Sequence, residues 1–424
     1  MVFNLSIVLA TALLTTLVTI VLHNLSSGER KIRYQLDGVA PPGDQAFVRI
    51  MGHLLGPPIE PGNRIRSLIN GVEIFPPMFD AIRGARKTIT LENYIYWSGE
   101  VGRAFADALS ERARTGVRVH VLLDWFGSAS LDGAALQQMT EAGVQIERYH
   151  PPGWSNLWRL NQRTHRKILV VDGRIGFIGG AGIADVWLGN ADSPDHWRDS
   201  HFQVEGPVVA QLQAAFTDNW LKTRAEVLYQ DDYFPELESV GPSRAQVFRS
   251  SPREGSGSVR LMFLLSIAAA RQRILLANSY FAPDSQVINA LSAARKRGVR
   301  VEIIVPGPIT DVPVVRRASR ARWGKLLEAG IEIYEYHPTM YHCKVMVVDD
   351  CWVSVGSTNF DNRSFRLNDE ANLNVIDVEL ATEQARVFDN DKGQSKQVSF
   401  AEWRHRPWRE KAIEWLAAQF RGQL

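Results

Sequence analysis

The chain repeats itself: four blocks of sequence in its first half recur in the same order in its second half. The matched pairs are 85–99 with 270–284, 114–124 with 296–306, 139–151 with 326–338, and 164–180 with 341–357. Matched blocks in a constant order indicate a duplicated domain, so one fold is expected twice. With 424 residues, 45% of them hydrophobic, the chain is long enough to bury two cores of this size.

Within each copy, short β-rich runs alternate with helical stretches. Residues 104–116 and 286–298 carry apolar side chains at helical spacing and end on glycine, a common helix stop. The apolar runs that follow, 117–123 and 299–305, are typical of buried strands. This alternation predicts an α/β fold with two mixed, mainly parallel sheets and flanking helices, the copies being related by a pseudo-twofold. We assign the copies to residues 45–235 and 240–395.

The N-terminus predicts a membrane anchor over residues 1–25. No charged residue occurs between Val2 and Leu22, and about 20 apolar residues suffice to span a bilayer. A cleaved signal peptide is the competing interpretation, but no basic residue precedes the run and no clear A-x-A site follows it. Arg30, Lys31 and Arg33 follow the run, so the positive-inside rule leaves the main body in the cytoplasm.

Charge and cysteine content narrow the function classes. The net charge of +2 gives no strongly basic footprint of the kind that binds nucleic acid. Cys343 and Cys351, the two cysteines, provide no disulfide framework and fit a reducing compartment.

The last matched block carries the candidate chemistry, because both copies contain the pattern H-x-K-x-x-x-x-D. Its members are His165, Lys167 and Asp172 in the first copy and His342, Lys344 and Asp349 in the second. Residues two apart on a strand point to the same face, so each histidine and its lysine can address one ligand. Asp172-Gly173 is a hairpin-type turn signal, so each aspartate is expected to end its strand and to tie down the turn.

Two histidines in one cleft suit phosphodiester chemistry. A neutral imidazole can attack phosphorus while a protonated one donates a proton to the leaving oxygen. The lysines supply positive charge where the phosphoryl oxygens become more negative. This scheme requires neither a metal nor another cofactor, and we expect none. A single H-x-K pattern is a weak signal, but two copies at equivalent places in a duplicated domain are a strong one.

The paired motifs resemble the signatures of the phospholipase D superfamily, and the surrounding sequence resembles its bacterial cardiolipin synthase branch. The likeness runs from about Gly62 to about Glu379. It is carried by the runs Asn93-Tyr94-Ile95-Tyr96, HRKILVVDGRIGFIGG (165–180), WRDSHFQVEGPVV (197–209), NSYFAPD (278–284) and GSTNFDNRSFRLNDEANL (356–373).

The resemblance implies roles for individual residues. One histidine becomes phosphatidylated, which family analogy assigns to His165, and the other protonates the departing alcohol. An acidic residue some thirty positions past each histidine orients that imidazole; Asp199 and Glu370 fit, although a plain strand-edge carboxylate is the alternative. Asn359, with Ser357 beside it, matches the phosphate-contacting position. The first copy departs from this pattern, because Gly182 stands where the family has asparagine.

Three function classes remain open from the sequence. The resemblance favours a phosphatidyltransferase of the bacterial inner membrane that makes cardiolipin from two molecules of phosphatidylglycerol, an anionic phospholipid. A hydrolytic phospholipase D, with water as the acceptor, would use the same residues. A nuclease of the superfamily would gain from a basic surface that this chain lacks, so no nucleic-acid partner is expected.

Two further segments have less specific signals. The tail 396–424 is amphipathic and suits either a membrane-interface helix or a helix docked on the protein. Its apolar face comprises Trp408, Ala412, Trp415, Leu416 and Phe420. A basic stretch of Arg316, Arg317, Arg320 and Arg322 suits either anionic lipid or a solvated surface.

Overall fold

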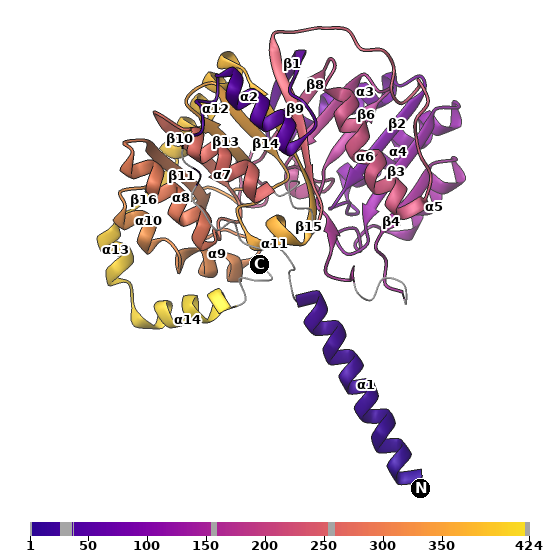
Figure 1. The fold of residues 1–424 in the computed structure, drawn as a ribbon. Coiled ribbons are helices and arrows are strands. Elements are labelled where there is room, and N and C mark those ends of the chain that lie inside the picture. The colour runs from indigo at the N-terminus through magenta and orange to yellow at the C-terminus, as the bar shows by residue number, and fades with distance from the viewer. Residues whose placement is uncertain (1, 26–35, 37, 154–158, 253–258, 420–424) are drawn as a thin grey trace.

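The computed structural model describes residues 2–25, 36, 38–153, 159–252 and 259–419 (Figure 1). Helix α1 (Val2–Leu25) stands apart from the body and has 24 residues, a length of about 36 Å. Its segment Leu5–Leu22 has a mean hydropathy of 2.5 and none of it is buried in the structure. The helix is therefore long and apolar enough to cross a bilayer. The basic residues Arg30, Lys31 and Arg33, on which the orientation prediction depends, lie outside the described residues.

The body contains two copies of one α/β unit. The first copy comprises β1 (Glu60–Ile69), α3 (Asn70–Gly84), β2 (Thr88–Asn93), α4 (Glu100–Arg114), β3 (Arg118–Asp124), α5 (Gly133–Glu141), β4 (Gln145–Tyr149), β5 (Arg163–Thr164), β6 (Ile168–Val171), β7 (Ile175–Gly179), the 3-10 turn η3 (Asp185–Trp187), β8 (Ser200–Glu205) and α6 (Val209–Arg224).

The second copy follows the same order. It comprises β9 (Ser243–Ser250), α7 (Val259–Ala269), β10 (Arg273–Asn278), α8 (Ser285–Lys296), β11 (Arg300–Pro306), α9 (Pro313–Arg320), α10 (Gly324–Glu328), β12 (Glu332–Tyr336), β13 (Lys344–Val348), β14 (Trp352–Gly356), α11 (Asn362–Arg366), β15 (Asn368–Ile376) and α12 (Val378–Gly393). Three short elements end the chain: β16 (Ser395–Val398), α13 (Phe400–His405) and α14 (Trp408–Gln419).

The sheet is mixed, as predicted, but it is continuous and mainly antiparallel. The strand order is β16-β12-β11-β10-β13-β14-β15-β9-β1-β8-β7-β6-β2-β3-β4. Only β2-β3-β4 and β10-β11-β12 on this path are parallel. The prediction of mainly parallel sheets was wrong because tight turns join β6 to β7 and β13 to β14, and such turns force antiparallel pairing. The prediction of two separate sheets was also wrong, since β1 pairs with both β8 and β9.

The two copies share a hydrophobic core. One cluster of buried side chains belongs to the first copy and another to the second. A third cluster combines β6–β8 and α6 of the first copy with β13–β15 and α12 of the second. Because both copies contribute side chains to this cluster, they pack as one body. This packing fixes the position of one histidine motif relative to the other.

The predicted domain boundaries differ from the structure at both ends. Helix α2 (Gln45–Ile50) and the π-helical turn η1 (Met51–Leu55) pack into the core of the second copy, where the ring of Phe47 meets that of Trp352 edge-on at 5.0 Å. The apolar residues of α2 and η1 are buried against the second copy, although both elements precede the first copy in the sequence. At the other end, β16 pairs with β12, so the sheet of the second copy extends to Val398.

Candidate active site

Each histidine motif is held by backbone from the opposite copy. The His165 N–H donates to the Asp369 carbonyl oxygen at 2.9 Å, and the His342 N–H donates to the Arg198 carbonyl oxygen at 2.7 Å. Asp369 and Arg198 immediately precede Glu370 and Asp199, the two candidate orienting carboxylates. The duplicated fold thus places each histidine beside the carboxylate of the other copy.

The side chains repeat this crossed arrangement. His165 Nδ1 lies 3.0 Å from Glu370 Oε2, and His342 Nδ1 lies 2.7 Å from Asp199 Oδ2. All four side chains are buried. The structure therefore confirms that the two carboxylates meet the imidazoles, but the prediction that each serves the histidine of its own copy was wrong. The sequence separations of 205 and 143 residues explain why spacing alone did not reveal the pairing.

Glu370 is fixed by polar side chains from its own copy. Ser357 Oγ donates to Oε2 at 2.5 Å, Ser364 Oγ donates to Oε1 at 2.7 Å, and Asn368 Nδ2 donates to Oε1 at 3.2 Å. Burial acts to raise the pKa of Glu370, but His165, Lys167 and Ser357 outweigh it, so the pKa is lowered. Ser357, which was predicted to bind phosphate, holds this carboxylate in the structure.

Asp199 is fixed differently. Trp187 Nε1 donates to Oδ2 at 2.9 Å, and the Ser200 N–H donates to Oδ1 at 2.8 Å. Burial opposes ionisation, but His342, Lys344 and Trp187 lower the pKa of Asp199 overall. Both carboxylates are therefore ionised near neutral pH.

Trp187 also explains why Gly182 replaces the family asparagine. A Cβ at Gly182 would lie 2.9 Å from the Trp187 ring, so a larger side chain has no room there. The same ring meets the His342 imidazole edge-on at 5.4 Å. In the second copy, Asn359 keeps its place, and its Oδ1 accepts from Ser279 Oγ at 2.8 Å. The role of Trp187 beside Asp199 and His342 was not predicted from the sequence. The one sequence feature that pointed to it was glycine at position 182, where the family has asparagine.

The two lysines lie within electrostatic reach of each other. Lys167 Nζ donates to the His165 carbonyl oxygen at 2.9 Å, and Lys344 Nζ donates to Ser279 Oγ at 2.8 Å. Burial and, to a smaller extent, the neighbouring Lys344 lower the pKa of Lys167 to about 7. Burial lowers the pKa of Lys344 as well. Positive charge buried on these two lysines favours a negatively charged ligand between them.

Without substrate, both histidines are neutral near pH 7. Burial lowers the pKa of His165 to about 4, against the opposing effect of Glu370. Burial and the ammonium of Lys344 lower the pKa of His342. A neutral imidazole whose Nδ1–H donates to a carboxylate presents a lone pair on Nε2, which is the form required of a nucleophile or base.

The aspartates of the two motifs lie away from the histidines. Asp172 accepts from the backbone N–H groups of Arg86, Lys87 and Thr88 at 2.7–2.9 Å, and Asp349 does the same for residues 271–273 at 2.6–3.0 Å. Each lies beyond the far end of its strand, about 20 Å along the chain from its histidine. Tying down the turn is the role that was predicted from the sequence, and this placement does not support grouping the two aspartates with the catalytic residues.

We expect Asp172→Ala to affect stability rather than chemistry. It removes the acceptor of three backbone hydrogen bonds, so the free energy of unfolding should fall by about 1–3 kcal/mol. Turnover per folded molecule should stay within a few-fold of the wild type. Denaturant unfolding and product formation on one detergent-solubilised sample measure both quantities, with Asp349→Ala as the matched variant. A fall in turnover above a hundredfold in fully folded protein would return Asp172 to the catalytic set.

Within the described residues, no group of three or more His, Cys, Asp or Glu side chains is placed to hold a metal ion.

Two histidine–lysine pairs, brought together from two copies of one α/β unit and held by crossed carboxylates, define a phosphodiester site of the phospholipase D type. A family model described as cardiolipin synthase, PLD-like domain, matches residues 78–220 and 264–392, one segment in each copy. The chain belongs to this cardiolipin synthase family of phospholipase D-like phosphatidyltransferases. Members are membrane enzymes that act on phospholipids.

Individual relatives agree with this assignment. Cardiolipin synthase A of Pseudomonas fluorescens is 36% identical over 362 residues, which are 85% of this chain and 74% of the relative. Cardiolipin synthase A of Pseudomonas syringae pv. syringae is 37% identical over 360 residues, which are 84% of this chain and 74% of the relative. The crystal structure of phosphatidylserine synthase from Haemophilus influenzae covers 84% of this chain and 92% of its own, with a TM-score of 0.62 and 15% identity. That structure supports the fold alone.

Proposed function

We propose that the chain joins two phosphatidylglycerol molecules into cardiolipin and releases glycerol, through a phosphatidyl-histidine intermediate. The observation that carries this proposal is the crossed arrangement, in which two buried imidazoles each have Nδ1 on a carboxylate of the opposite copy, so that the chemistry falls to Nε2. One imidazole acts as nucleophile, and the other moves the proton.

In the first step, the nucleophile is His165. Lys344 Nζ lies 3.1 Å from His342 Nε2 and competes for its lone pair, whereas Lys167 donates to the His165 carbonyl oxygen. His165 Nε2 forms a bond to phosphorus while the bond from phosphorus to the glycerol oxygen breaks. The anionic phosphodiester raises the pKa of His342, which then gives its Nε2 proton to the departing oxygen.

In the second step, His342 acts as a base. It takes the proton from a glycerol hydroxyl of a second phosphatidylglycerol, and that oxygen attacks phosphorus. The bond between phosphorus and His165 Nε2 breaks, cardiolipin leaves, and His342 is again protonated for the next cycle. Lys167 and Lys344 stabilise the phosphoryl oxygens, which carry more negative charge in both transition states. Asn359 adds a side-chain amide from the second copy.

The membrane arrangement follows from α1. We infer that α1 is an uncleaved single-pass anchor in the bacterial inner membrane and that the body faces the cytoplasm, where the basic residues after the span favour its retention. Two free cysteines, Cys343 and Cys351, fit that compartment.

The test is lipid analysis of the purified full chain in phosphatidylglycerol vesicles with chelator present, with products separated by mass. Cardiolipin and free glycerol in equal amounts are expected. Phosphatidic acid in place of cardiolipin would make the enzyme a hydrolase and overturn the transferase proposal. No turnover of any phospholipid, together with cleavage of single-stranded DNA, would overturn the lipid assignment as well.

A further inference from the structure

Helix α14 is held against the body by buried charges. Glu414 accepts from Arg406 Nε at 2.7 Å and from Arg320 Nε at 3.1 Å, and it is buried. The guanidinium of Arg406 also stacks on the Trp403 ring, 4.1 Å from its centroid. Breaking a buried ion pair is costly, so these contacts fix the orientation of α14 on α9 and α13.

This docking turns the apolar face of α14 away from the protein. Ala417 and Ala418 are buried beside Glu414, whereas Trp408 is 74% exposed and Trp415 is 62% exposed. Leu416 and Ile413 are 56% and 47% exposed. Trp408, Trp415 and Leu416, three members of the predicted apolar face, are therefore exposed and not docked on the body. Phe420, its last predicted member, lies outside the described residues. Large apolar side chains gathered on one exposed face mark a contact surface.

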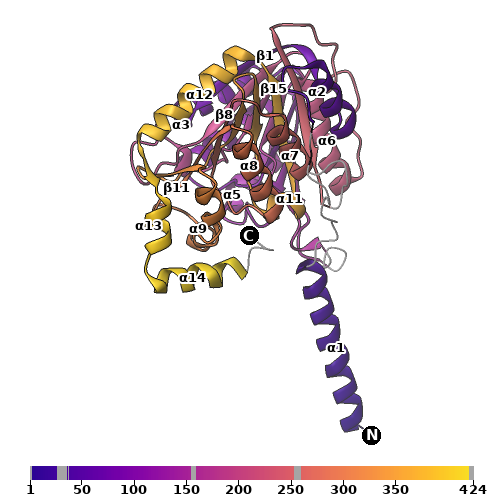
Figure 2. The same ribbon diagram turned by 60° about the vertical axis from the view of Figure 1, so that its left-hand side comes forward.

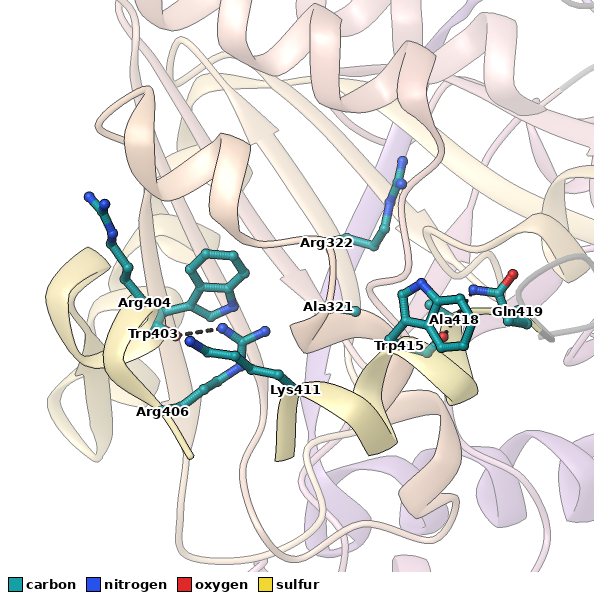
Figure 3. A pocket seen from close by; sticks show the side chains of 9 residues that line it. All are labelled: Ala321, Arg322, Trp403, Arg404, Arg406, Lys411, Trp415, Ala418 and Gln419. Carbon is teal, nitrogen blue, oxygen red and sulfur yellow. Dashed lines mark hydrogen bonds between the residues drawn. The ribbon is translucent and has the colours of Figure 1, made fainter. Parts of the chain in front are cut away.

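A basic cavity opens beside this face. It has a volume of about 450 Å³ and lies between α9, α13 and α14 (Figure 3). Its charged lining side chains are all cationic: Arg322, Arg404, Arg406 and Lys411. Trp403 and Trp415 supply its aromatic walls. Arg406 is neutralised by Glu414, but Arg404 and Lys411 are exposed to solvent.

The rest of the basic stretch has another role. Arg316 and Arg320 both pair with Glu335, which is buried at the end of β12. Neither of the two alternatives for this stretch, contact with anionic lipid or a solvated surface, describes Arg316 and Arg320, whereas Arg322 lines the cavity.

The position of α14 points to a bilayer as its partner. In both views of the molecule, α14 lies on the side of the body from which α1 extends, and it runs across the direction of α1 (Figures 1 and 2). If α1 spans the membrane, α14 lies along the membrane surface. Tryptophan on one face with arginine and lysine beside it is the chemistry of a membrane-interface helix.

We propose that α13 and α14 form a second membrane contact, in which the cavity holds the phosphate of an anionic phospholipid. Trp408, Ile413 and Leu416 enter the boundary between head groups and acyl chains, while Trp415 and the cationic side chains that line the cavity face the head group and its phosphate. This contact sets the height of the body above the bilayer. It rests on the membrane anchoring proposed above but not on the reaction that the active site performs.

The test measures depth in the bilayer instead of turnover. The full chain carries His165→Ala, so that lipid is not consumed, and Cys351→Ser, with a fluorophore at Leu416→Cys. It is reconstituted in vesicles with lipids brominated on the acyl chain, with and without phosphatidylglycerol. Glu383→Cys on α12, at the end of the body away from α1, is the matched control position (Figure 1). With phosphatidylglycerol present, we expect quenching at Leu416→Cys to exceed that at Glu383→Cys at least threefold.

Charge reversal tests the phosphate contact. Arg404→Glu with Lys411→Glu should remove most of the dependence on phosphatidylglycerol, whereas Arg114→Glu with Arg386→Glu, at exposed sites elsewhere, should leave it unchanged. Equal quenching at both labelled positions would overturn the membrane contact. Strong quenching that does not depend on phosphatidylglycerol would overturn the phosphate site. A concentration-dependent dimer in detergent that buries the label would assign the face to a second copy of the chain instead.

Discussion

Replacing either His165 or His342 with alanine is expected to reduce cardiolipin formation at least about 10⁴-fold. The two imidazoles perform different tasks on one phosphodiester, so neither can take over when the other is removed. Both are buried beside a carboxylate of the opposite copy, and a shared core fixes their relation. The measurement is product formation in phosphatidylglycerol vesicles, with thermal unfolding as the control for folding.

Mixing the two single variants tests whether the two histidines of a site belong to the same chain. Both histidines of a site belong to one chain, so a mixture of His165→Ala and His342→Ala protein should stay inactive. Recovery of about a quarter of the activity would show that the site forms between chains. Near-normal turnover by either single variant would show that the two motifs do not share a site.

The second large effect is expected from the crossed carboxylates. Asp199→Asn and Glu370→Gln keep the shape of the side chain but remove the negative charge that stabilises an imidazolium. Each variant should lose about 10²–10⁴-fold in turnover, the range that the loss of an orienting carboxylate produces in catalytic triads. Because the partner histidine loses an anion, its pKa should fall, and one limb of the pH–rate profile should move to lower pH.

An activated substrate tells which histidine each carboxylate serves. A phosphatidyl ester of p-nitrophenol releases a stable phenolate and needs no proton donor, so the first burst of phenolate reports only on the nucleophile. With His165 as nucleophile, the crossed geometry predicts that Asp199→Asn and His342→Ala keep this burst. Glu370→Gln and His165→Ala should lose it. The opposite pattern for the two carboxylate variants would mean that each serves the histidine of its own copy.

The two half-sites are not equivalent, although they arose by duplication. Glu370 is held by hydroxyl and amide groups, whereas Asp199 is held by the Trp187 indole and a backbone N–H. Lys344 lies against the ring of His342, whereas Lys167 lies over the ring of Tyr94, 5.6 Å from its centroid. Different surroundings for the two imidazoles suit different roles, one as nucleophile and one as proton carrier.

The sequence alone determined the features that depend on local spacing and on repetition. The duplicated α/β unit, the apolar N-terminal helix and the two histidine–lysine pairs can all be predicted from it. The Asp172-Gly173 turn was also predicted, and in the structure both residues have positive φ, 51° and 61°. These properties are set by residues close together in the chain, so a linear pattern records them.

The tertiary structure alone decided which distant residues meet. Packing of β6–β8 against β13–β15 brings each histidine to the carboxylate of the other copy, across as many as 205 residues. The same packing places Trp187 beside His342, and tertiary contacts carry α2 to the second copy and turn the apolar face of α14 outward. Such contacts depend on how whole sheets and helices pack, and side-chain spacing along the chain contains no record of that.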